Sequence, residues 1–131
     1  MKNLKYDDRL NLICWETAGS SDFIELRPYE DGPAIIDTID AFAALPLKAD
    51  ALFIPCTGGS LKPVKGWRLG DSDITFVKLS GGYSITHRST GVQITGGLYK
   101  TRAQALDQLP RAVIELSRAR NIIANWRTLN L

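Results

Sequence analysis

The chain has no hydrophobic run long enough to cross a membrane, which sets a first limit on its function. A membrane-spanning helix needs about 20 consecutive apolar residues, and no stretch approaches that length. The N-terminal residues, MKNLKYDDRLNLICW, lack the apolar segment and small-residue cleavage site of a secretory signal. We therefore expect a cytoplasmic protein with no membrane partner.

Histidine and cysteine are scarce, which disfavours most metal sites and most nucleophilic mechanisms. His87 is the single histidine, and Cys14 and Cys56 stand far apart in apolar surroundings. Zinc sites need clustered cysteine and histidine ligands at short spacings, which this sequence does not have. We therefore expect no metal and no cofactor. We interpret both cysteines as buried thiols, because one pair does not make a disulfide framework.

No pattern of catalytic residues stands out. The run PCTGGS at 55–60 is rich in glycine, but it lacks the Lys-Ser ending of a phosphate-binding P-loop. It also lacks an arginine at the spacing that thiol phosphatases use, so we interpret it as a turn. Asp71 and Asp73 are typical of turn residues as well. We expect no catalytic residues, and an enzyme with a site around Cys56 and His87 is the least favoured hypothesis.

Length and composition are those of an ordinary globular protein, and the charge is nearly balanced. At 131 residues, 44% apolar and 23% charged, the chain is expected to form a single domain (residues 1–131) with its own core. The net charge of +2 is low for a protein that coats nucleic acid without specificity. The charges are unevenly spread, however. Most acidic residues lie in 1–60, and most lysines and arginines lie in 61–131.

The second half of the chain predicts a β-meander followed by a helix. Residues 74–79, 83–87 and 92–95 are rich in strand formers, and glycines separate them, so we expect three short strands. Thr101 and Gln104 have the spacing of a capping box at a helix start. The helix should run to about Ala119, with a kink or a fresh start at Pro110. We expect a break near Arg120, followed by a short segment in which three apolar residues cover a neighbour: Ile122, Ile123 and Trp126.

The first half predicts a hairpin, a helix and a short strand. Residues 10–15 and 23–27 favour a hairpin, with a helix over 4–15 as the alternative. Asp31, Gly32 and Pro33 indicate a helix start, and Pro46 ends that helix. Residues 51–56 favour a strand, and 57–73 a long loop with at most a short strand at 67–69. The expected fold is α+β: an antiparallel sheet of four to six strands, including the meander, with two main helices packed on one face.

The run GYSITHRSTGVQITGGLYKTRAQAL, at 82–106, resembles the DNA-binding domain at the N-terminus of phage-type integrases, in which a three-stranded sheet precedes a helix. The matching residues are Tyr83, Gly91, Tyr99, Lys100, Thr101, Arg102 and Ala105. The resemblance implies a sheet that enters the DNA major groove. The residues that would face the bases are Ser84, Thr86, Arg88, Gln93 and Thr95. This chain departs from the family in having few basic residues on those strands.

We therefore predict a small, non-catalytic binding module that contacts nucleic acid through its basic half. Lys100 and Arg102 flank an expected open helix start, where unpaired N–H groups favour anions. The remaining candidates are three basic residues of the 57–73 loop, one arginine beside the meander and two aromatic residues for stacking: Lys62, Lys65, Arg68, Arg88, Trp67 and Tyr83. The alternative is a protein-binding inhibitor or adaptor of the kind that phages and plasmids carry. The oligomeric state stays open.

Overall fold

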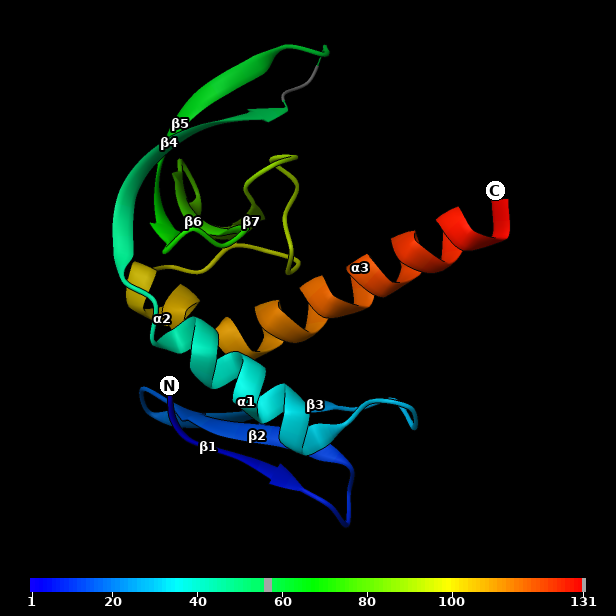
Figure 1. Cartoon of the computed structure of the whole chain (residues 1–131). Helices are drawn as coiled ribbons and strands as arrows, with labels where there is room; N and C mark the ends of the chain where they lie inside the picture. Colours follow the sequence, from blue (N-terminus) through cyan, green and yellow to red (C-terminus); the bar gives the residue numbers. More distant parts are fainter. Residues whose placement is uncertain (56–57, 131) are drawn as a thin grey trace.

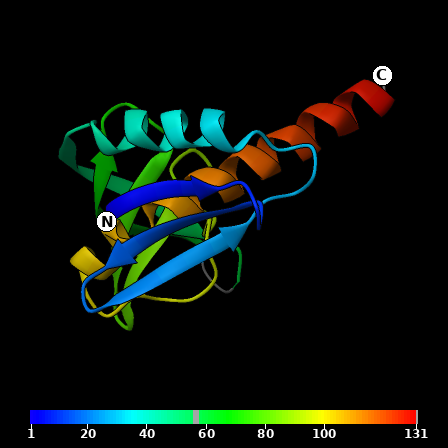
Figure 2. The same cartoon turned by 90° about the horizontal axis from the view of Figure 1, so that it is seen from below.

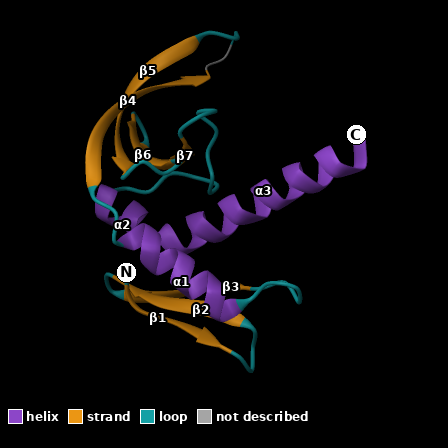
Figure 3. Ribbon diagram, viewed as in Figure 1, coloured by secondary structure: helices purple, strands orange, loops and turns teal. Residues whose placement is uncertain are grey.

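The computed structural model describes residues 1–55 and 58–130, with side chains for 1–54 and 58–120, and shows an α+β fold. The elements are β1 (Lys2–Asp7), β2 (Leu12–Thr17), β3 (Ser20–Glu25), α1 (Gly32–Ala43), β4 (Leu47–Pro55), β5 (Leu61–Leu69), β6 (Ile74–Leu79), β7 (Gly82–His87), α2 (Arg102–Leu106) and α3 (Leu109–Asn130). The strands form two antiparallel sheets, β1-β2-β3 and β4-β5-β6-β7 (Figure 1). The helices lie between these sheets (Figure 3). The α+β class is thus confirmed, but the arrangement differs from a single sheet with helices on one face.

The first sheet contains one strand more than the predicted hairpin. Residues 2–7, which look like a polar lead-in, form β1 and pair with β2, with Tyr6 opposite Ile13. A two-residue turn joins β2 to β3, and Gly19 in that turn has a φ of 82°, which glycine adopts without strain. Side chains alternate along these strands, so one face packs on the core and the other faces outward.

Helix α1 begins and ends where local sequence signals place it. The Asp31 side chain accepts a hydrogen bond from the Ala34 N–H at 3.1 Å, and Pro33 lies in the first turn. At its start the helix lies against β1, because a Cβ on Gly32 would come within 2.4 Å of the Tyr6 ring. Ile39, near its C-terminal end, is fully buried. The predicted helix is therefore confirmed.

The prediction of a long loop over residues 57–73 is wrong, because the central residues of this stretch form the nine-residue strand β5. β5 pairs with β4 along its whole length, from Leu47 opposite Leu69 to Pro55 opposite Leu61. The long hairpin curls around β6 and β7 (Figure 1). Gly66 permits β6 to approach β5 closely, because a Cβ there would lie 2.9 Å from the Thr75 methyl group. β5 also pairs with β6, so β6 lies between β5 and β7 in the second sheet.

The prediction of a third meander strand over residues 92–95 is also wrong. Residues 92–95 make only one isolated bridge to β7, between Thr86 and Gln93. The chain then returns along β7 through a second bridge, between Tyr83 and Tyr99. This second bridge brings the start of α2 beside β7.

The helical segment after residue 101 is divided in two. α2 ends at Leu106, and α3 begins at Leu109 with Pro110 in its first turn, so the fresh-start alternative is confirmed. The expected break near Arg120 is wrong, because the backbone of α3 stays helical to Asn130. The C-terminal part of this helix projects away from both sheets (Figure 2). The predicted packing of Ile122, Ile123 and Trp126 concerns side chains that lie outside the described residues.

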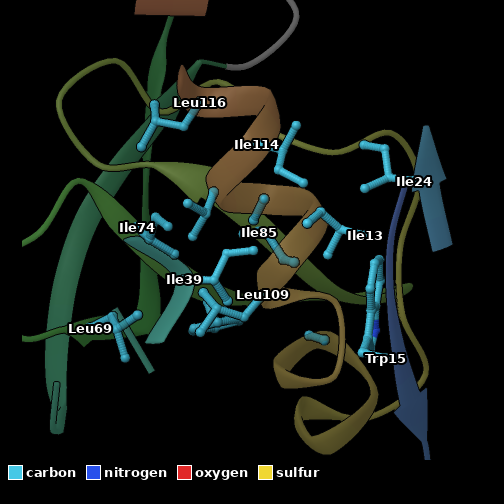
Figure 4. Packing of buried hydrophobic residues seen from close by; sticks show 14 of the residues in the cluster. Ile13, Trp15, Ile24, Ile39, Leu69, Ile74, Ile85, Leu109, Ile114 and Leu116 are labelled. Carbon is cyan, nitrogen blue, oxygen red and sulfur yellow. The ribbon is translucent and has the colours of Figure 1, made fainter. Parts of the chain in front are cut away.

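A single hydrophobic cluster joins the two sheets through the helices (Figure 4). The first sheet supplies Ile13, Trp15 and Ile24; the helices supply Ile39, Leu109, Ile114 and Leu116; and the second sheet supplies Leu69, Ile74, Phe76 and Ile85. This cluster fixes the position of α2 and α3 relative to β5 and β7. In the part of the chain that the structure describes, no helix is long and apolar enough to cross a membrane.

Candidate nucleic-acid interface

Two aromatic rings and a guanidinium group meet where β5, β7 and α2 come together. The ring centroids of Trp67 (β5) and Tyr83 (β7) lie 6.1 Å apart, with their planes tilted by 41°. The guanidinium carbon of Arg102 (α2) lies 4.7 Å from the centroid of the Trp67 ring. At this distance the positive charge is attracted to the electron-rich face of the indole. Elements that are far apart in the sequence thus bring two aromatic rings and one cation into contact.

Strand pairing positions the two aromatic rings. Trp67 lies opposite Phe76 in the sheet, and Phe76 lies opposite Ile85. Phe76 and Ile85 are fully buried, whereas Trp67 is half-buried at the border of the core. Tyr83 shares a face with Ile85 two residues along β7, so its ring lies beside Trp67.

A close approach between β7 and the segment before α2 brings Arg102 beside Trp67 and Tyr83. Tyr83 and Tyr99 exchange two backbone hydrogen bonds, of 2.7 and 2.9 Å. Gly82 has a φ of 140°, and a Cβ there would lie 2.5 Å from the Tyr99 carbonyl oxygen. Glycine is therefore required at this position for the two segments to meet.

The predicted capping signal is present at the start of α2. The Thr101 hydroxyl accepts a hydrogen bond from the Gln104 N–H at 3.1 Å, and the Gln104 side chain accepts one from the Lys100 N–H at 3.1 Å. These bonds hold Lys100 and Arg102 on either side of the cap. However, α2 has only five residues, so its dipole is weaker than that of the long helix that the sequence predicts.

Two further lysines lie on the same side of the second sheet. Lys65 precedes Trp67 by two residues on β5, and Lys78 lies opposite Tyr83 in the pairing of β6 with β7. Lys65, Lys78, Lys100 and Arg102 are exposed, and none forms an ion pair with any residue whose side chain is described. Sequence reasoning missed Lys78, which only the strand register connects with Tyr83. We call the group of six residues the Trp67 surface: Lys65, Trp67, Lys78, Tyr83, Lys100 and Arg102.

The structure places the other candidate residues elsewhere. Arg88 forms an ion pair with Asp50 of β4, at 2.7 Å between Nε and Oδ2. The hydrogen bond from Arg88 lowers the pKa of Asp50 against the effect of burial, and Asp50 in turn raises the pKa of Arg88. The Arg68 guanidinium donates to the backbone oxygens of Ser72 and Asp71. Lys62 points to the face of β5 opposite Trp67.

Other arginines of the basic half bind acidic residues and backbone oxygens of the first half. Arg118 on α3 contacts both carboxylate oxygens of Glu30, at 2.8 and 3.1 Å. Burial raises the pKa of Glu30, but hydrogen bonds from Arg118 and from a backbone N–H lower it more, so the pKa lies below its ordinary value. Arg111 contacts one carboxylate oxygen of Asp22, at 3.1 Å. The uneven charge of the sequence thus serves partly to join its two halves.

The residues implied by the integrase resemblance are mostly covered. Ser84, Thr86 and Thr95 are buried, and the hydroxyl groups of Ser84 and Thr86 lie 3.0 Å apart. Gln93 is exposed beside them. The three buried residues therefore offer no surface to a DNA groove in this structure.

His87 lies at the end of β7, and Cys14 lies on β2 of the first sheet. His87 Nδ1 lies 2.8 Å from the Thr90 hydroxyl in the turn that follows β7, and Nε2 lies 3.6 Å from an Asp73 oxygen. Cys14 is half-exposed on the outer face of the first sheet, so its predicted burial is wrong. Cys56 lies outside the described residues. No group of three or more potential metal ligands occurs within the described ranges, 1–55 and 58–130.

Comparisons with models of protein families, with curated protein sequences and with solved structures find no match to this chain. Function must therefore be inferred from the chemistry of the Trp67 surface.

Proposed function

We propose that the protein binds single-stranded nucleic acid through the Trp67 surface and catalyses no reaction on it. The observation that supports this proposal is the cluster of Trp67, Tyr83 and Arg102, beside lysines that form no ion pair with a described side chain. Proteins that bind single strands combine aromatic rings, on which bases stack, with cations that follow the phosphates. The Trp67 surface offers both kinds of group on neighbouring elements.

The aromatic rings favour a single strand over a duplex. A base inside a duplex already stacks on its neighbours, so its faces are not free to contact Trp67 or Tyr83. A base in a single strand has free faces and can stack on an accessible ring. It can also stack on the planar guanidinium of Arg102, which lies over the indole and extends the stack outward.

The cations of the surface set the expected dependence on salt. Four cations that each neutralise one phosphate of a single strand give a log–log slope of affinity against salt of about −3. Loss of one such contact should change this slope by about 0.7. Both quantities follow directly from a titration at several salt concentrations.

A fluorescence-anisotropy titration with a labelled, mixed-sequence DNA oligonucleotide tests the proposal. Arg102→Gln should weaken binding and make the salt slope shallower, whereas Lys62→Gln, on the opposite face of β5, serves as the matched control and should leave both unchanged. The same oligonucleotide annealed to its complement should bind more weakly. A binding curve unchanged by salt, or equal losses in the two variants, would contradict the proposal.

A protein partner is the second candidate for the same surface. Tryptophan, tyrosine and arginine are the residues that contribute most often to protein–protein binding energy. A protein interface of this kind would lose affinity on Trp67→Ala, yet its affinity would respond much less to salt. The salt series therefore separates the two candidates.

A further inference from the structure

The hairpin of β4 and β5 extends beyond the other two strands of its sheet (Figure 1). β6 pairs with β5 only at residues 66–68, whereas β4 pairs with β5 along its whole length. Within the described part of the chain, residues 51–55 and 61–65 therefore form a ribbon of two strands, which we call the hairpin arm. Alternating side chains divide the arm into two faces.

Strand register places one face of the hairpin arm next to the Trp67 surface. Phe53 lies opposite Pro63, which is four positions along β5 from Trp67, with Lys65 midway between them. Residues an even number of positions apart point to the same side of a strand, so Trp67, Lys65 and Phe53 follow one another on one face. Leu52 points to the other face and is buried.

This face of the hairpin arm exposes large apolar side chains. Phe53 is 60% exposed, and Leu61, which lies on the same face nearer the tip, is 66% exposed. Neither belongs to the core cluster. Exposed apolar groups that adjoin one another mark a site of interaction. Because they continue the row that contains Trp67, the site that they mark is an extension of the Trp67 surface.

The charge of this face suits a phosphate backbone. Asp50 is the only acidic residue of β4 and β5, and it points to the opposite face, where it binds Arg88 at 2.7 Å. Lys65 is the cation between the two aromatic positions. Ala49 and Ala51, its neighbours on β4, are exposed and small, so no bulky side chain interrupts the path.

We propose that a single strand bound at the Trp67 surface continues across Lys65 to Phe53, which stacks a further base. Alternation of aromatic rings with cations is the pattern that binds single strands. The inference rests on the proposed function and adds one binding residue, Phe53, to it. Four positions of a β-strand span about 13 Å. This is the length of about four nucleotides at the 3.4 Å spacing of a stacked strand.

The dependence of affinity on oligonucleotide length tests this path. NMR titrations at low salt compare thymidine oligonucleotides of about three and about ten nucleotides. With two bases on Trp67 and Tyr83, the third base of the short oligonucleotide does not reach Phe53. Phe53→Ala should therefore weaken binding of the long oligonucleotide about tenfold and leave that of the short one unchanged. Trp67→Ala should weaken binding of both.

Two variants control for the loss of an exposed ring. Phe23→Ala removes a phenylalanine that is 54% exposed on the first sheet, and it should bind both oligonucleotides as the wild-type protein does. Phe53→Tyr keeps an aromatic ring and should recover most of the affinity that Phe53→Ala loses. The backbone amides of Phe53 and Leu61 should shift with the long oligonucleotide only.

The outcomes separate this inference from the function on which it rests. If the wild-type protein binds neither oligonucleotide, the proposed function is wrong and the inference is wrong with it. If both bind and Phe53→Ala binds the long one as tightly as the wild-type protein does, the path along the hairpin arm is wrong, and the Trp67 surface remains. Equal losses for the two lengths in Phe53→Ala would also overturn the inference.

Discussion

Replacing Arg118 by methionine should destabilise the protein strongly, because Arg118 connects the basic and acidic halves of the chain. Its guanidinium group makes two hydrogen bonds to the carboxylate of Glu30 and one to the backbone oxygen of Glu25. The Arg118 side chain is 12% exposed and that of Glu30 is 10% exposed. Methionine keeps most of the volume of the side chain but leaves the carboxylate without its charged partner.

The burial of both partners sets the expected size of the effect. An exposed ion pair contributes at most about 1 kcal/mol, because water screens it. Removal of one partner from a buried pair costs about 3–5 kcal/mol, since the remaining charge stays desolvated. Here about a tenth of each side chain still meets water, so we expect a loss near the lower limit, about 3 kcal/mol.

Urea unfolding at neutral pH, followed by circular dichroism, measures this loss. Lys48→Met is the control, because Lys48 and Asp71 form a 3.7 Å pair that is well exposed, and its loss should cost less than about 0.5 kcal/mol. The double variant Arg118→Met with Glu30→Gln should recover part of the stability, because it also removes the unpaired charge. Equal losses in Arg118→Met and Lys48→Met would refute the reasoning.

Three further predictions follow from the contacts described above. Stability to urea should fall as the pH drops below the ordinary carboxyl pKa of about 4. The reason is that four carboxyl groups accept hydrogen bonds in the folded state that lower their pKa values: Glu30, Asp50, Asp73 and Asp107, the last of which binds the N-terminal ammonium group and the Ala18 N–H. The stability that these groups contribute is complete above that pH and is lost as the pH falls through their folded-state pKa values. A urea midpoint that rises on acidification would contradict this. Gly82→Ala should lower the melting temperature more than Gly19→Ala, because both have positive φ but only Gly82 also meets a carbonyl oxygen, and the opposite order would refute this. Thr101→Ala should cost about 1 kcal/mol in urea unfolding, and Thr101→Ser should recover most of it; no loss would show that the cap is unimportant.

Elements with local chemical signals could be predicted from the sequence. The cap at Asp31 and the capping spacing of Thr101 and Gln104 lie within four residues of the groups they bind, so the sequence displays them directly. The strand at 61–69 has no such signal, because Pro63 and Gly66 interrupt its alternation. Pairing with β4 on one side and with β6 on the other supplies its hydrogen bonds.

The candidate surface could be predicted only in part, because it too depends on contacts between residues that are far apart in the sequence. Aromatic and basic side chains suit nucleic-acid contact, so residue type alone predicts three members of the surface: Trp67, Tyr83 and Arg102. Arg88 has the same chemistry, but its charge is neutralised by Asp50, 38 positions away in the sequence. Such a partner is visible only once the sheet is formed. Lys78 enters the surface through strand register alone.

The most direct test of the proposed interface is the set of NMR resonances that a bound single-stranded oligonucleotide shifts. We predict shifts of the Trp67 indole signal and of the backbone amides of Lys100 and Arg102. The indole of Trp15, buried beneath the first sheet, should not respond. Shifts confined to the first sheet, or no shift at Trp67 at saturating oligonucleotide, would contradict the account.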